Sequence, residues 1–142
     1  MRIRVPLFLF CSAVVLILFA GCGSSELPSA ADEAKIITHK TAGFLSPDGE
    51  IAVRFVEDMA EEGQVGVALT KKVFTFSPSI EGVTRWVDAR TIAFKPARPL
   101  AIETKFTGYL DLEALLPDKM ASRGRIPIEF ETSGLSIISM SA

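Results

Sequence analysis

FSPSIEGVTRWVDARTIAFKP, residues 76–96, is the stretch that predicts the fold of this chain. Residues 84–88 and 91–96 each read as a short strand, and in the second of these Ile92 and Phe94 alternate onto one face. Only Ala89 and Arg90 separate the two runs, which is typical of a β-hairpin. The stretch also holds Trp86, the only tryptophan of the chain. We expect its indole to pack in a core, with stacking against a ligand as the alternative.

The same alternation predicts further short strands at residues 50–56, 72–76, 103–112, 125–132 and 135–141. In the fourth of these stretches, Pro127 favours a sheet edge or an early strand position. In the third, Gly108 predicts a bulge or a close approach of two backbones. The acidic residues 57–70 are expected to form a loop or a short helical turn, and residues 112–120 one helical turn that ends before Pro117. About six or seven strands of this kind predict an all-β sandwich of immunoglobulin-like type.

The first residues of the chain have the pattern of an export signal. Two arginines lie within residues 1–4, and residues 7–20 form an apolar run broken only by Ser12. As a helix this run would span about 21 Å, short of the roughly 30 Å of a bilayer's hydrocarbon core. The pattern therefore predicts a cleaved signal peptide at residues 1–21, with an uncleaved anchor as the alternative.

The sequence LFAGC at residues 18–22 resembles the bacterial lipobox, in which small residues precede a cysteine that becomes acylated. Ala20 and Gly21 match the small positions, whereas Phe19 stands where the motif usually has leucine. The resemblance implies that acyl chains such as palmitate join Cys22 to membrane lipid, in the bacterial envelope at the periplasmic face or the outer membrane. The polar residues after Cys22 favour a flexible tether over residues 22–42. An ordinary secreted protein with a chance cysteine is the alternative.

The charge and the cysteine and histidine content of the chain exclude several classes of partner and site. Removal of residues 1–21 takes Arg2 and Arg4 from the 15 basic side chains and leaves all 17 acidic ones, so nucleic acid is not an expected partner. Cys11 would leave with the signal peptide, and Cys22 alone forms neither a disulfide nor a cysteine-rich metal site. His39 is the only histidine, which excludes a histidine-based triad or a multi-histidine metal site.

The remaining charged clusters predict no chemistry. The acids Glu57, Asp58, Glu61 and Glu62 lack the ligand spacing of a calcium loop and are interpreted as a solvated connection. Asp88, beside Arg90, is expected to serve the hairpin. We therefore expect no catalytic residue, no metal site, no cofactor and no enzymatic activity. Four basic residues give the middle strands a charged edge, which fits either a protein-partner surface or protection against strand-to-strand aggregation: Arg85, Arg90, Lys95 and Arg98.

Residues 51–132 resemble the first macroglobulin-like domain of bacterial α2-macroglobulins. The marks of the resemblance are Phe55, Phe76, Ser77, Pro78, Gly82, Trp86, Asp88, Thr91, Phe94, Pro96, Pro99 and Leu100. It implies a macroglobulin-type sandwich at residues 43–134, in the N-terminal structural module of a membrane-anchored protease inhibitor. Adjacent macroglobulin domains, other proteins and, in a full-length protein, proteases would be its partners. Residues 135–142 would begin a following strand or a truncated next domain.

The Cys-x-Glu-Gln thioester by which some members of that family trap proteases does not occur in this sequence, so covalent trapping by this chain is excluded. Similar patterns occur in bacterial immunoglobulin-like surface domains. A stand-alone adhesive or binding lipoprotein, with a protein or glycan as its partner, is therefore the alternative. A small soluble enzyme or inhibitor is a third, weaker hypothesis.

Overall fold

The computed structural model describes residues 29–120 and 123–134. The helices are α1 (Ala30–Ile36), α2 (Leu112–Leu115) and α3 (Pro117–Met120). The strands are β1 (Ile37–Lys40), β2 (Ala42–Leu45), β3 (Ile51–Phe55), β4 (Phe74–Ser77), β5 (Gly82–Trp86), β6 (Thr91–Pro96), β7 (Lys105–Asp111) and β8 (Arg125–Thr132). The predicted signal peptide at residues 1–21, the lipidation site Cys22 and the predicted strand at 135–141 lie outside the described residues.

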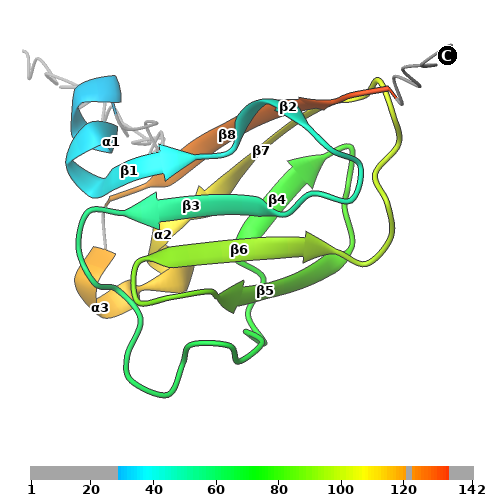
Figure 1. Ribbon diagram of the computed structural model, residues 1–142. Helices are drawn as coiled ribbons and strands as arrows, with labels where there is room; N and C mark the ends of the chain where they lie inside the picture. Colours follow the sequence, from blue (N-terminus) through cyan, green and yellow to red (C-terminus); the bar gives the residue numbers. More distant parts are fainter. Residues whose placement is uncertain (1–28, 121–122, 135–142) are drawn as a thin grey trace, which may run out of the picture.

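The strands form two four-stranded sheets, with the orders β1-β3-β6-β5 and β2-β8-β7-β4. Figure 1 shows the first sheet in front of the second. Lettered along the chain, the strands reproduce the A-B-E-D and G-F-C sheets of an immunoglobulin sandwich. The predicted all-β, immunoglobulin-like sandwich is therefore confirmed.

The first strand of the sandwich belongs to both sheets. Its first half, β1, pairs antiparallel with β3, and its second half, β2, pairs parallel with β8. Thr41 lies between the two halves. Its N–H donates to the carbonyl of Ala52, and its hydroxyl accepts from the N–H of the same residue, both at 2.9 Å. These two bonds hold the chain to β3 at the point where it leaves one sheet for the other.

The core lies between the sheets and consists of the inward residues of each strand. Phenylalanines from both sheets meet at its centre, where the rings of Phe76 and Phe94 lie 5.2 Å apart and those of Phe76 and Phe130 6.3 Å apart. Trp86 is 2% exposed and packs against Phe55 with 5.8 Å between the ring centroids. The predicted packing role of Trp86 is confirmed.

The local predictions hold in most places. β3, β6 and β8 cover the predicted stretches to within a residue or two. α2 ends before Pro117 as expected, but the single helical turn predicted for residues 112–120 is wrong, because a second one, α3, begins at Pro117, where proline fits the first position of a helix. Pro127 is the third residue of β8 and precedes the part of that strand that pairs with β2, so it occupies an early position in an inner strand. The hairpin connection is longer than predicted: β5 ends at Trp86, so residues 87–90 form the turn.

The tether predicted over residues 22–42 is wrong for its second half. Residues 30–42 form α1, β1 and the start of β2, so the folded domain begins well before residue 43. Ser29 caps α1 by accepting from the N–H of Asp32. The physical reason is the apolar pair Ile36 and Ile37, 4% and 6% exposed, which buries against the core. The polar residues that follow Cys22 favour a linker. Burial of Ile36 and Ile37 makes residues 30–42 part of the folded domain instead.

Candidate functional site

The residues that carry the family resemblance are structural in this fold. Phe76 and Phe94 form the core, and Pro78 follows β4 after a cis peptide bond. Gly82 faces Pro96 across the β5–β6 pair. A Cβ on Gly82 would lie 2.7 Å from the Phe94 ring, so a larger residue would clash there. Phe76, Gly82 and Phe94 therefore serve the packing of the sandwich.

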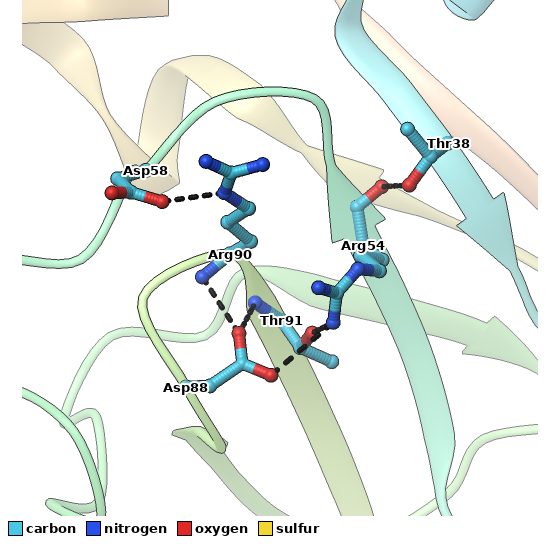
Figure 2. Close-up of polar contacts among 6 residues, drawn as sticks. All are labelled: Thr38, Arg54, Asp58, Asp88, Arg90 and Thr91. Carbon is cyan, nitrogen blue, oxygen red and sulfur yellow. Dashed lines mark hydrogen bonds and ion pairs between the residues drawn. The ribbon is translucent and has the colours of Figure 1, made fainter.

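Asp88 stabilises the turn between β5 and β6, as Figure 2 shows. Its Oδ1 accepts from the backbone N–H groups of Arg90 and Thr91, each at 2.8 Å. Its Oδ2 pairs with Arg54 at 3.3 Å, and Arg90 pairs with Asp58 at 2.5 Å. The N–H of Arg90, with help from Thr91 and from the charge of Arg54, lowers the pKa of Asp88. The prediction that Asp88 serves the hairpin is confirmed.

The predicted basic edge is largely neutralised by ion pairs. Arg85 donates to both carboxylate oxygens of Glu50 at 3.0 Å. Lys95 lies 4.0 Å from the same carboxylate, and Arg98 pairs with Glu81 at 3.4 Å. These contacts leave little net positive charge for an acidic partner.

The free edge of β5 is covered by the chain itself. The N–H of Gly66 donates to the carbonyl of Trp86, and the N–H of Leu69 to that of Thr84, both at 2.8 Å. Residues 65–69, named here the covering segment, thus occupy the place of a neighbouring strand. Protection of this edge comes from backbone pairing more than from charged side chains.

A cleft of about 450 Å³ is lined in part by Trp86 and is the strongest candidate for a functional site. Its other lining residues come from two stretches, 59–71, with Val67, Ala68 and Leu69 of the covering segment among them, and 115–119 of α2 and α3. The lining includes buried or half-buried apolar side chains: Met59, Leu69, Trp86, Leu115 and Leu116. It also includes polar side chains: Glu61, Gln64, Thr70, Lys71, Asp118 and Lys119.

The four charged side chains of the cleft form no ion pair with any residue that the structure describes. Elsewhere on the domain most arginines and lysines are paired, as the contacts of Arg54, Arg85 and Arg98 illustrate. The lining of the cleft therefore combines apolar side chains with charges of both signs that make no ion pair among the described residues.

Sequence reasoning did not find this cleft. Residues 57–70 and 112–120 are the two stretches without a strand pattern, which is the only signal that they carry. The sequence predicts a core position for Trp86, with ligand stacking as the alternative. Nothing in the sequence indicates that the two irregular stretches meet over Trp86, because the sheets alone bring them together.

Over the described ranges, no group of three or more histidine, cysteine or acidic side chains is arranged to hold a metal ion. Nor does any helix in this part of the chain combine the length and the hydropathy that a membrane span requires.

Comparison with known proteins identifies no family. No protein-family model and no curated protein matches the chain. Among solved structures, it is similar to an L,D-transpeptidase from Mycobacterium tuberculosis H37Rv, with a TM-score of 0.46 and 11% identity over 69% of this chain and 40% of that one. It is also similar to L,D-transpeptidase 3 from Mycobacterium tuberculosis, with a TM-score of 0.45 and 11% identity over 69% of this chain and 37% of that one. The chain spans less than half the length of these enzymes, and likenesses this distant carry no conclusion about its activity.

Proposed function

We propose that this chain is the membrane-anchored N-terminal module of a bacterial α2-macroglobulin-like protease inhibitor, with a structural rather than a catalytic role. The observation that carries the proposal is the agreement between the family signature and the fold. Signature residues such as Gly82, Trp86 and Asp88 occupy positions where the sandwich needs that residue type.

The path of the chain through the domain supports an architectural role. The described chain enters beside α1, and it leaves from the far end of β8 at the opposite end of the sandwich (Figure 1). A domain with this path can link a membrane on one side to a further domain on the other. Since α1 begins at Ala30, only residues 23–29 separate Cys22 from the first helix. Acylation of Cys22 would hold the α1 end within about 25 Å of the lipid.

The anchor is tested by the substitution Cys22→Ser. We expect the variant to leave the membrane fraction, because acyl chains on this thiol supply the membrane affinity. Mass spectrometry of the mature wild-type N-terminus checks the same point. A Cys22→Ser protein that stays membrane-bound, or an unmodified Cys22 on a chain that keeps its leader, would contradict the lipoprotein assignment.

The inhibitor assignment is tested at the genomic locus. A reading frame that continues past codon 142 into further sandwich domains and a Cys-x-Glu-Gln sequence supports it. A stop codon there, followed by unrelated sequence, overturns it.

A second function, a stand-alone surface lipoprotein that binds a protein or glycan, is supported by the cleft over Trp86. The two functions share the anchor and the fold. They differ in whether the sandwich serves mainly as a spacer or as a binding module.

A further inference from the structure

We propose that the pair Lys71–Lys72 is a site of limited proteolysis by a trypsin-like serine protease, and that this cut releases the covering segment from the edge of β5. The two lysines end the irregular stretch that leads into β4. The inference goes beyond the proposed function and depends neither on the lipid anchor nor on the inhibitor assignment.

The lysine pair lies in the most exposed stretch of the described chain. Eleven of the twelve residues from Glu61 to Lys72 are exposed, and half-buried Leu69 is the exception. No other run of twelve described residues is exposed to this degree. Exposed loops are the preferred sites of proteolytic nicking, because a protease must draw the chain into its own active-site cleft.

The competing sites are less suited to such a protease. All basic side chains from Cys22 onward belong to residues that the structure describes, so the comparison covers every one of them. Lys95 and Arg98 are each followed by proline, whose ring hinders cleavage of the bond before it. Most of the others lie in helices or strands, where the backbone is hydrogen-bonded along its length: Lys35, Lys40, Arg54, Arg85, Lys105, Lys119 and Arg125.

Two further basic residues, Arg90 and Arg123, lie outside the helices and strands but are held by hydrogen bonds. The N–H of Arg90 donates to Asp88, and its carbonyl accepts from the N–H of Phe55, both at 2.8 Å. The N–H of Arg123 donates to the carbonyl of Met120 at 3.0 Å. The lysine pair, which is exposed on both sides of one peptide bond, is therefore the favoured site.

The reaction is a hydrolysis. A trypsin-like protease recognises the ammonium group of a lysine, here Lys71, with a carboxylate in its primary pocket. The carbonyl carbon of Lys71 loses its bond to the nitrogen of Lys72 and gains the oxygen of a water molecule, which leaves a carboxylate on Lys71 and an ammonium group on Lys72. The bond after Lys72 is less accessible, because Val73 is 1% exposed and its carbonyl accepts from the N–H of Asp111 at 2.9 Å.

The cut removes one of the two points that keep the covering segment near β5. In the intact chain, Met59 fixes one end through the bond from its N–H to Ala89, and Val73 fixes the other end in the core. Between these points, the N–H groups of Gly66 and Leu69 hold the segment on β5. A loop fixed at both ends keeps these donors close to their acceptors, so a free end two residues beyond Leu69 should let both bonds open far more often. The carbonyls of β5 then form an open sheet edge.

The test uses residues 22–142 with Cys22→Ser, and trypsin at a low ratio of protease to protein. We expect mass spectrometry of the first cut to give mainly the fragments 22–71 and 72–142. These should elute together from a sizing column, because strands on the two sides of the cut pair with one another. Hydrogen exchange at the Leu69 amide should become at least about tenfold faster in the cut protein.

Variants and an internal reference separate the site from general unfolding. The double variant Lys71→Gln, Lys72→Gln should slow the first cut at least about tenfold. Lys119→Gln, at an exposed position of α3, is the matched control and should be cut as the wild type is. The amide of Ile92, in the inner strand β6, should exchange at the same rate before and after the cut. Circular dichroism establishes that each variant is folded.

A first cut anywhere but at the lysine pair would overturn the proposal, and so would an unchanged rate of cleavage in the folded double variant. Equal exchange at Leu69 in the intact and the cut protein would reject the release of the covering segment. None of these outcomes bears on membrane fractionation, so failure here is distinguishable from failure of the proposed function.

Discussion

Two glycines show how single residues determine this fold. A Cβ on Gly108 would lie 2.7 Å from the Phe76 ring carbon Cδ1, and one on Gly82 equally close to Phe94. In both places an aromatic side chain lies across a glycine on the neighbouring strand, since Phe76 pairs with Gly108 and Gly82 lies beside Phe94. The new Cβ on Gly108 would come still closer to the backbone carbonyl oxygen of Thr75, so the close approach of two backbones predicted at Gly108 is confirmed.

The substitution Gly108→Ala should destabilise the domain by about 1–3 kcal/mol, because the new methyl group overpacks against Phe76 and the β4 backbone. Urea unfolding followed by circular dichroism measures the change. Thr107→Ala, one residue earlier on the exposed face of β7, should stay within about 0.5 kcal/mol. Equal stability of the two variants would contradict the packing account.

Asp88 gives a prediction that depends on pH. Asp88→Ala should cost about 1–2 kcal/mol at neutral pH, because it leaves the N–H groups of Arg90 and Thr91 without their acceptor. The folded state lowers the pKa of Asp88, so this contribution is present above the ordinary aspartate pKa of about 4. It is lost as the pH falls through the lower folded value. Unfolding measured at pH 7 and pH 3 should show a smaller difference between wild type and variant at the lower pH, whereas Glu62→Ala should show little effect at either.

At the scale of elements, the irregular stretch of residues 57–70 has a structural role. Residues 57–70 show no strand pattern, yet the covering segment within them closes the edge of β5 and contributes Val67, Ala68 and Leu69 to the lining of the cleft. Gly66 makes this possible, because its φ of +81° favours glycine and its N–H reaches the carbonyl of Trp86. Backbone geometry rather than side-chain periodicity places this segment.

Gly66→Pro should release the covering segment, because proline has no N–H and cannot adopt a positive φ. We expect faster hydrogen exchange at the Leu69 amide and self-association on a sizing column, through the edge of β5 that becomes free. Gly63→Pro provides the matched control, since Gly63 also has a positive φ and makes no backbone hydrogen bond to β5 within the described structure. If both variants behave alike, the effect comes from backbone strain and not from the lost hydrogen bond.

For the whole molecule, the first strand joins the two sheets and lengthens the domain toward the N-terminus. Residues 29–41 contribute Ile36 and Ile37 to the core and the pairing of β1 with β3. Their deletion should destabilise the domain by at least about 3 kcal/mol, because two isoleucine side chains become exposed or are lost. Thermal unfolding measures this loss. Deletion of residues 23–28 should leave the melting temperature unchanged. If neither deletion lowered the melting temperature, the tether predicted over residues 22–42 would be correct at its full length.

The sequence by itself determined the alternation of the strands, the sandwich class, the core role of Trp86 and the turn role of Asp88. Each of these follows from local periodicity or from hydrogen bonds between near neighbours in the chain, which a linear pattern records. The position of Ile36 and Ile37 in the core, the covered edge of β5 and the cleft were decided by the tertiary structure alone. These features arise where segments far apart in sequence meet, and burial at such a meeting depends on the stacking of two sheets, which no single stretch of sequence encodes.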